Sequence, residues 1–353
     1  MDYLTLSLLA AVSFFGISVV SGLGAISVEP IAVPPAIVKQ GYTPEVMTRQ
    51  LADEMRRIRE VAASRLRSTD VPGKAKEETL QQLGEYFGVQ IFVDAARRHL
   101  GVIRVAFSGE IHNAGGGDDV IELRVRAQVD DGRTILHTYR GRMDEVGRLL
   151  KAAAFDAMVI IDPYIATLYK RDEEMKAGHR DLPDTYALIA HCFKAMPRKD
   201  HHLVYNLWGR TLLVQGRYDE AIEKFSAAVE MRPDFGAGYL NIGRTLIRIG
   251  RNAAALEMLE RALTTYNDKA AVHREMFVAH VAMDQPTEAL AHIEKAIHAA
   301  PEDAELYAMQ ATLYRDLGRH SDAAAAYRQA LRLDPTEPKY QEGLARALGA
   351  KSS

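Results

Sequence analysis

The sequence predicts a mostly helical α+β protein with an N-terminal transmembrane helix, a small antiparallel-sheet α+β domain and a C-terminal α-solenoid. Three observations predict this fold class. Residues Tyr3 to Val28 carry no charged side chain, residues 102–140 alternate between apolar and polar side chains, and alanine recurs every 34 residues at 221, 255, 289 and 323. These patterns are typical of a membrane helix, of β-strands and of a helical repeat array, respectively.

The composition excludes several classes of protein. The chain has 353 residues, 48% of them hydrophobic, and a formal net charge of −3. This balance is that of a folded chain, and it lacks the bulk positive charge that drives nucleic-acid binding. The single cysteine, Cys192, excludes an intramolecular disulfide framework and a cysteine-based zinc cluster.

The uncharged run Tyr3–Val28 is longer than the roughly 20 residues that a membrane-spanning helix needs. We assign residues 1–28 to a transmembrane anchor that contacts the lipid bilayer through residues 3–28. A cleaved signal peptide is the alternative, because Gly22-Leu23-Gly24 could serve as a cleavage site, but the start of the chain lacks the basic residues of such a peptide.

The orientation in the membrane is open. The first basic residues after the span, Lys39 and Arg49, favour a cytoplasmic carboxyl-terminal part by the positive-inside rule, but the residues next to the span carry no charge bias. We expect a single-pass protein of a bacterial inner (plasma) membrane with a periplasmic soluble part, and a cytoplasmic one as the alternative.

Residues 29–42 contain Pro30, Pro34 and Pro35 and are predicted to form an extended spacer. An α+β domain follows over residues 43–161. Its first helix begins at Thr43-Pro44-Glu45 and runs to about Leu66. Apolar residues at helical spacing give this helix one buried face, comprising Met47, Leu51, Met55, Ile58 and Ala62.

Three strands are predicted next, at Val102–His112, Val120–Val129 and Thr134–Arg140, joined by glycine-rich hairpin turns into an antiparallel meander. Val89–Val93 is a candidate fourth strand, and a helix from Met143 to about Ile160 is expected to cover the sheet. Gly115-Gly116-Gly117 joins two strands, so it is not the strand-to-helix turn of a phosphate-binding loop.

The motifs FSGEIHN (107–113) and VIELRVRAQVDDGRT (120–134) resemble the small TolB-amino-terminal-like α/β domain that precedes helical repeats in some bacterial regulators. The resemblance covers about seventy residues. It implies the order of a small sheet domain followed by repeats.

The 34-residue period extends to several columns of the sequence, and its best copy is LWGRTLLVQGRYDEAIEKFSAAVEMRP (207–233). Alanine allows two helices to approach closely, glycine permits the turn between them, and proline ends the second helix. The pattern resembles the tetratricopeptide repeat, which implies stacked helix pairs. Its structural positions are Trp208, Gly209, Ala221, Ala228, Pro233, Gly243, Ala255, Ala262, Ala289, Ala296, Pro301, Ala323, Ala330 and Pro335.

We count four repeats within residues 202–337, at 202–235, 236–269, 270–303 and 304–337, and a capping helix with a tail at 338–353. Residues 162–201 are a helical connector or a degenerate repeat. The third repeat departs from the pattern, because Phe277 stands where glycine is usual and Asp284 and Gln285 replace the turn glycine. This puts the local geometry of that repeat in question.

The resemblance also implies that the concave face, lined by the first helix of each repeat, binds peptide segments of other proteins. Four arginines at these positions predict a basic wall and an acidic peptide or C-terminus as the ligand, whereas pairing with neighbouring acids is the alternative. Carried over by repeat position, the groove residues are Asn206, Arg210, Leu213, Leu240, Arg244, Ile247, Arg248, Arg274 and Val278.

No catalytic, cofactor or metal motif is evident in the sequence. It contains no Gly-x-Ser-x-Gly, no His-Glu-x-x-His and no P-loop, and no two histidines stand four residues apart. We therefore predict a membrane-anchored adaptor or scaffold that is not an enzyme and has no catalytic residues, metal or cofactor. The alternatives are a subunit of an envelope secretion or polysaccharide-export complex, an accessory regulator of a membrane enzyme, and an enzyme without a local motif.

Overall fold

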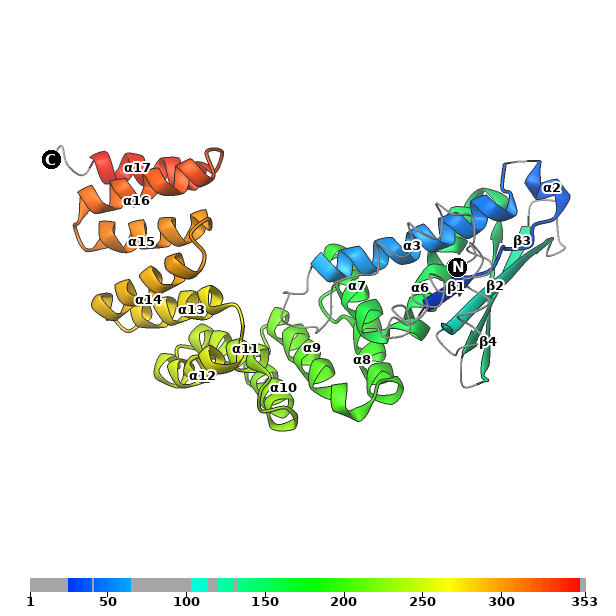
Figure 1. Cartoon of the computed structure of the whole chain (residues 1–353), viewed down its shortest axis with the longest axis horizontal. Coiled ribbons are helices and arrows are strands. Elements are labelled where there is room, and N and C mark those ends of the chain that lie inside the picture. The colour runs from blue at the N-terminus through cyan, green and yellow to red at the C-terminus, as the bar shows by residue number, and fades with distance from the viewer. Residues whose placement is uncertain (1–24, 40, 65–102, 114–119, 130–131, 350–353) are drawn as a thin grey trace, which may run out of the picture. The chain divides into compact units, whose positions relative to one another are not determined.

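The structure is a computed structural model of the chain, and it describes residues 25–39, 41–64, 103–113, 120–129 and 132–349. The chain divides into two compact units (Figure 1). The first unit ends at Lys170 and contains the β-sheet, and the second begins at Arg171 and contains the repeat helices. The chain thus combines a small sheet with a helical array, as the sequence predicts.

The sheet of the first unit has the strand order β1–β2–β3–β4. Strands β2 (Ile103–Asn113), β3 (Val120–Val129) and β4 (Thr134–Arg142) are antiparallel neighbours, with Leu123 opposite Tyr139. Alternate side chains of β3 are buried, which is the pattern of a sheet with one packed face. The predicted antiparallel meander is confirmed.

The fourth strand comes from a segment that the sequence assigns to the membrane anchor. Strand β1 (Ala25–Val28) runs parallel to β2, and the amide of Glu29 donates to the carbonyl of Phe107 at 2.7 Å. Residues 25–28 therefore differ from the predicted helix, because β2 offers their backbone a hydrogen-bonding edge. The candidate strand Val89–Val93 lies outside the described residues.

The membrane anchor is not tested by the structure. No helix in the part of the chain that the structure describes is long and apolar enough to cross a bilayer. Residues 1–24, which carry most of the predicted span, lie outside the described residues.

The proline-containing segment after β1 packs on the sheet and does not form the extended spacer predicted for residues 29–42. The amide of Ala32 donates to the carbonyl of Gly109 at 2.8 Å, and the amide of Ile31 donates to Thr48 Oγ1 at 2.9 Å. The side chain of Ile31 is buried. Proline removes only its own amide, so the residues between the prolines remain able to pair. A short helix, α2 (Pro35–Val38), follows.

Two long helices complete the core of the first unit. Helix α3 (Pro44–Ser64) contacts helix α6 (Val146–Ile161), and α6 contacts β3 and β4. The apolar face that the sequence predicts for α3 is buried in this contact, and its burial supplies much of the hydrophobic stabilisation of the unit. Every residue predicted to form the apolar face of α3 is buried, namely Met47, Leu51, Met55, Ile58 and Ala62.

The second unit is a series of consecutive helix pairs whose members are 13 or 14 residues long. A last helix, α17, packs on α16. The pairs are α9 (His201–Val214) with α10 (Tyr218–Met231), α11 (Gly236–Arg248) with α12 (Asn252–Thr265), α13 (Lys269–Ala282) with α14 (Pro286–Ala299), and α15 (Ala304–Asp316) with α16 (His320–Leu333), followed by α17 (Pro338–Gly349).

The periodic residues occupy the positions that their chemistry requires. Helices α10, α14 and α16 each end two residues before a proline of the repeat pattern, Pro233, Pro301 and Pro335. Trp208 is half-buried, with the ammonium group of Lys224 lying 4.5 Å from the centre of its ring. The alanines of both columns have no exposed surface: Ala221, Ala228, Ala255, Ala262, Ala289, Ala296, Ala323 and Ala330.

Glycine in the first helix of a pair allows the second helix to approach. A Cβ atom at Gly209 would lie 2.5 Å from the ring of Phe225, and one at Gly243 would lie 2.8 Å from the side chain of Leu259. Both distances are too short for a real Cβ contact. The glycines therefore set the spacing of the first two helix pairs.

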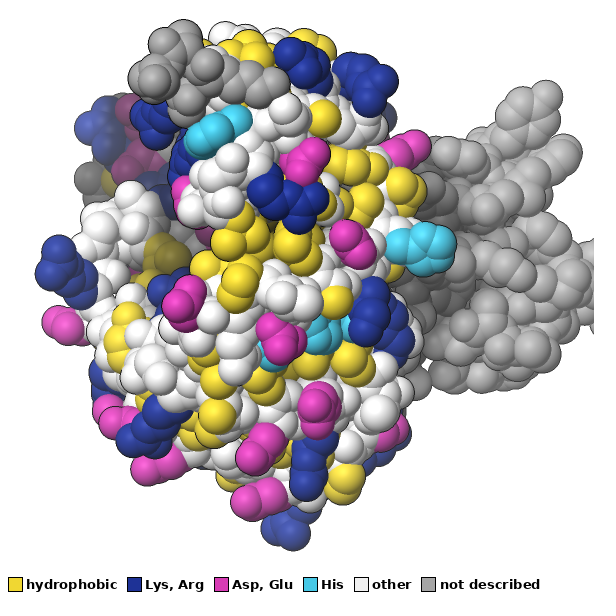
Figure 2. Space-filling model, turned by 90° about the vertical axis from the view of Figure 1, so that its left-hand side faces the viewer, with side chains coloured by type: hydrophobic (Ala, Val, Ile, Leu, Met, Phe, Trp, Pro, Cys, Tyr) yellow, Lys and Arg dark blue, Asp and Glu magenta, His cyan; other side chains and the backbone are white. Residues whose placement is uncertain are grey.

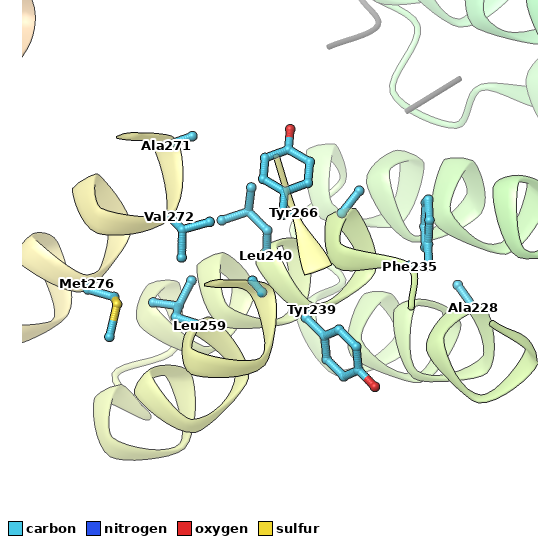
Figure 3. Close-up of a cluster of buried hydrophobic side chains, with 11 residues drawn as sticks. Ala228, Phe235, Tyr239, Leu240, Leu259, Tyr266, Ala271, Val272 and Met276 are labelled. Carbon is cyan, nitrogen blue, oxygen red and sulfur yellow. The ribbon is translucent and has the colours of Figure 1, made fainter. Parts of the chain in front are cut away.

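Neighbouring repeats share their hydrophobic cores. Leu240 of α11, Leu259 of α12 and Val272 and Met276 of α13 belong to one buried cluster (Figure 3). No single helix pair encloses this cluster, so each pair depends on the next for burial of its apolar face.

Helix α8 (Pro183–Ala195), which follows α7 (Pro163–Lys176), resembles the second helix of a repeat. It contacts α9, and Cys192 and Val204 share a buried cluster. The buried residues of α8 have the same spacing as those of α10, and each lies 36 residues before its counterpart in α10. This favours a degenerate repeat over a connector for residues 162–201. The corresponding pairs are Thr185 with Ala221, Ile189 with Phe225 and Cys192 with Ala228.

Candidate functional site

The candidate site is the face formed by the first helices of the repeats. Helix α11 contacts both α9 and α13, so these three first helices lie side by side. Stacked helix pairs form a curved array with an extended concave surface, to which the sequence analysis assigns the first helices. This face carries the residues that the sequence predicts for a binding groove.

Two asparagines join α9 to α11 on this face. Asn241 Nδ2 donates to Asn206 Oδ1 at 2.8 Å. The side chain of Asn206 has no exposed surface, whereas Asn241 is partly exposed. The bond satisfies the buried Asn206 oxygen and links the first two repeats. Because Asn206 is buried, it does not line the predicted groove, and Asn241 presents the polar group instead.

An ion-pair network continues from α11 to α13 and α15. Arg244 Nε lies 2.8 Å from Glu275 Oε1, and a terminal nitrogen of Arg274 lies 3.5 Å from the same oxygen. The other terminal nitrogen of Arg274 lies 3.7 Å from Glu305 Oε2. Arg244, Arg274 and Glu275 each keep no more than a quarter of the side chain exposed, whereas Glu305 is 63% exposed.

This network changes the predicted basic wall. Glu275 lies between Arg244 and Arg274 and neutralises part of their charge, which is the alternative that the sequence left open. Arg248 is exposed at the end of α11, and Arg210 is half-buried on α9. The predicted groove therefore presents paired charges of both signs at its middle and a more exposed cation at one side.

The apolar members of the predicted groove have different surroundings. Leu213 and Val278 are half-buried. Ile247 is half-buried as well and packs against two core clusters. Leu240 is 1% exposed and lies inside the shared core, so it does not line a surface. Its neighbour Asn241 carries the polar group that reaches the inner face.

The sequence analysis missed Asn241, Glu275 and Glu305. Asn241 lies 35 residues after Asn206, not 34, because the side chains that meet across two helices are not those at equivalent repeat positions. Glu275 directly follows Arg274, and the sequence shows no more than this adjacency as a sign of its pairing. Long-range ion pairs depend on how the helices are stacked, which the period alone does not give.

Two observations describe the surface chemistry further. On the face shown in Figure 2, basic and acidic side chains are interspersed and no large region carries one sign of charge. Among the described residues, no group of three or more His, Cys, Asp or Glu side chains could hold a metal ion.

The sheet unit carries a separate polar cluster at its edge strand. Tyr139 of β4 donates its hydroxyl to Asp156 Oδ2 of α6 at 2.7 Å, and His137 Nδ1 lies 3.2 Å from the same oxygen. Burial, with the carboxylate as a second cause, raises the pKa of the Tyr139 phenol. The cluster ties β4 to α6, and we assign it a structural role.

Comparisons with known proteins address the repeat array. The family model described as tetratricopeptide repeat matches residues 206–270 and 274–348. The TolB-like resemblance of the middle domain lies outside these ranges and stays a prediction. The comparison with curated proteins gives no match.

Solved structures that are similar to this chain include the following three. A thermophilic TPR protein from Thermus thermophilus is 20% identical, covers 54% of this chain and 98% of its own length, and gives a TM-score of 0.44. PilW, a widely conserved type IV pilus biogenesis factor, is 19% identical, with coverages of 54% and 88% and a TM-score of 0.47. YrrB, a TPR protein with an unusual peptide-binding site, is 16% identical, with coverages of 57% and 98% and a TM-score of 0.39.

The family match covers the same helices that carry the buried alanine columns, the close glycine contacts and the helix-ending prolines. Tetratricopeptide repeats generally serve as protein-interaction modules and not as enzymes. The carboxyl-terminal array of this chain, over residues 206–270 and 274–348, thus matches the tetratricopeptide-repeat family model.

Proposed function

We propose that this protein is a membrane-anchored adaptor whose repeat array binds an extended segment of a partner protein along α9, α11 and α13. The observation that carries the proposal is two sets of polar partners across these helices: the partly exposed Asn241, bonded to Asn206, and the Arg244–Glu275–Arg274 ion pairs. Side-chain amides pair with peptide backbone, and guanidinium groups pair with carboxylates.

The ion pair between Arg274 and Glu305 is a contact that a ligand can replace. Glu305 is 63% exposed and 3.7 Å from the guanidinium, and exposed ion pairs of this kind stabilise a fold by only about 0–1 kcal/mol. A carboxylate of a bound peptide can replace Glu305 at little cost. Arg248, which is exposed on α11, supplies a further cation. An acidic segment or a C-terminus is therefore the expected ligand.

Site-specific photo-crosslinking in the full chain, in its native membrane, tests the binding face. A crosslinking residue is placed at Leu213, Arg248 or Val278 on the first helices. The matched control positions are the exposed residues Glu223 and Glu257 on the second helices α10 and α12. We expect the same partner to crosslink from the first helices only. Crosslinks of equal yield from α10 and α12 would move the binding site to the outer face.

The anchoring part of the proposal concerns the uncharged run that precedes β1. With residues 25–28 in the sheet, the run from Tyr3 to Gly24 is 22 residues long, which is still sufficient to span a bilayer. We place the chain in an inner membrane, with the soluble part in the periplasm. Extraction of membranes at high pH tests the anchor, and protease protection of the soluble part in spheroplasts tests the orientation.

The same membranes distinguish an adaptor from a permanent subunit. A subunit of an envelope complex co-purifies with its partners in a fixed ratio, whereas an adaptor exchanges them. We expect an excess of the Arg248→Glu variant to leave the partner bound to the unmodified chain. An excess of the control variant Arg328→Glu, at an exposed position on the second helix α16, is expected to displace the partner from the unmodified chain. Equal competition by both variants would contradict binding along the first helices.

A further inference from the structure

Three histidines meet inside the third repeat, between helices α13 and α14. His273 Nδ1 and His292 Nδ1 lie 3.1 Å apart. The ring of His280 stacks on that of His292, with centres 5.1 Å apart and an angle of 12° between the ring planes. All three side chains are partly exposed. The cluster joins two positions on α13 to one on α14, so it forms part of the contact between the two helices.

The short distance restricts the protonation of this cluster. A hydrogen bond between two ring nitrogens needs one donor and one acceptor, so at least one of His273 and His292 is neutral. His280 Nδ1 lies 2.8 Å from Gln285 Oε1, which can only accept, so this nitrogen carries a proton. If His273 and His292 are both protonated, the hydrogen bond is replaced by two facing N–H groups on like charges.

The charges near the cluster add to this repulsion. Lys295 of α14 acts on both His273 and His292, and Lys269 of α13 acts on His273. Burial is the largest cause that lowers the pKa of His292, to about 4, and it lowers the pKa of His273 as well. The positive charge of the lysines shifts both pKa values in the same direction, and that of the neighbouring imidazoles also lowers the pKa of His292.

Other charged groups on the packed helices are engaged elsewhere or exposed. Arg244 of α11 and Arg274 of α13 share Glu275, and Arg274 also reaches Glu305 of α15. Arg261 of α12 lies over the ring of Tyr239, and Arg315 of α15 pairs with Asp316. The exposed charged or titratable side chains are Arg248 of α11, Glu257 and Glu260 of α12, and Glu288, Glu294 and His298 of α14.

The cluster is also linked to the turn between the two helices. This turn passes through Asp284, which adopts a φ of +56°, and Gln285, whose side chain accepts from His280. The amide of Gln285 donates to the carbonyl of His280 at 2.9 Å. The cluster is therefore hydrogen-bonded to the turn as well as forming part of the helix contact.

We propose that the α13–α14 helix pair is an acid-sensitive joint of the repeat array, in which protonation of the His273–His280–His292 cluster separates the two helices. The closed pair disfavours protonation of His273 and His292, because both are partly buried and their Nδ1 atoms are in contact. Well above pH 6.5 these two imidazoles are neutral in both the closed and the opened pair, and the contact has its full stability. As the pH falls from about 6.5 toward 4, the opened pair takes up protons that the closed pair does not, so the closed pair loses stability.

Hydrogen–deuterium exchange of the full chain at about pH 7.5 and about pH 5 tests this proposal. Protection factors are compared, because they correct for the pH dependence of intrinsic exchange. The pair α11–α12 is the internal reference, since it contains no histidine. We expect protection of α13–α14 to fall on acidification by about tenfold more than that of α11–α12. A local readout is required because burial also lowers the pKa of His202, in the first repeat.

Three variants make the result specific. His292→Gln removes the central imidazole, and we expect the pH response of α13–α14 to fall to that of α11–α12. His298→Gln, at an exposed position on the same helix, is the control and is expected to keep the full response. His273→Gln provides a second test if His292→Gln does not fold at neutral pH. An equal response of the two helix pairs in the unmodified chain, or an unchanged response in both cluster variants, would overturn the proposal.

Discussion

The second and third repeats each pack two helices against each other, but with different residues at the equivalent position of the first helix. In the second repeat, Gly243 lets α12 approach so closely that a Cβ atom would lie 2.8 Å from Leu259. In the third repeat the equivalent residue is Phe277, which is buried in a cluster with Ile293 and with Leu306 of the next repeat. The large side chain of Phe277 thus packs toward the following helix pair, whereas Gly243 has no side chain to do so.

The turns of these two repeats show the same principle. Gly250 has a φ of +77°, and Asp284 at the equivalent position has a φ of +56°. The backbone hydrogen bonds match as well, since Arg251 donates to Leu246 and Gln285 donates to His280, both at 2.9 Å. The backbone geometry of the repeat is therefore preserved, although the residue that is normally required for it is absent.

Removing the large side chain is expected to have the largest effect on this comparison. Phe277→Ala leaves a cavity between the third and fourth repeats, and such substitutions destabilise a protein by about 3–5 kcal/mol. Urea unfolding of the full chain, followed by circular dichroism, measures the change. Val281→Ala is the control on the same helix, because Val281 is 43% exposed. A loss below about 1 kcal/mol would show that the third repeat does not depend on this side chain.

Overpacking of the alanine columns is the next largest effect. Ala255→Trp in the second repeat and Ala289→Trp in the third insert a large ring where neither alanine has exposed surface. We expect each to destabilise the array by about 1–3 kcal/mol or more. Ala254→Trp, at an exposed position next to Ala255, controls for the presence of tryptophan. Unchanged melting of both buried variants would contradict the assigned helix contacts.

Exchanging the turn residues gives a smaller effect. Gly250→Asp forces a side chain into the left-handed region that Asp284 already occupies, and this costs about 1–2 kcal/mol. No atom lies within 4 Å of a Cβ built at Gly250, so the cost is one of backbone conformation and not of collision. Thermal unfolding measures it, and Gly250→Asn is expected to lose less, because asparagine tolerates this region better.

The repeats were predictable because their period is a local property that recurs. The buried alanines, the prolines after the second helices and the buried face of α3 all follow from spacing within one helix. The same spacing indicated that the third repeat departs from the pattern at Phe277 and Asp284. It did not show that Asp284 would adopt a positive φ and keep the turn unchanged.

The features that the sequence did not predict depend on residues that are distant in the chain. Strand β1 pairs with β2, which begins 75 residues after β1 ends, and an apolar strand is not distinguishable from the end of a membrane helix by hydropathy. In the candidate site, the period predicted that Arg244 and Arg274 lie on the inner face. It did not predict the acidic residue that pairs with both. Glu275 became part of the site through the stacking of α11 on α13.

The smallest expected effect is the reverse exchange in the third repeat, Asp284→Gly. Glycine adopts the positive φ of this turn without strain, but it also gains conformational freedom in the unfolded chain. The two contributions oppose each other, and we expect a net stabilisation of about 0.5–1 kcal/mol. Thermal unfolding of Asp284→Gly beside Gly250→Asp shows whether the two turns are equivalent. If Asp284→Gly is instead destabilising, the carboxylate of Asp284 stabilises the turn in a way that glycine cannot replace, and the third repeat keeps its geometry by a different mechanism from the second.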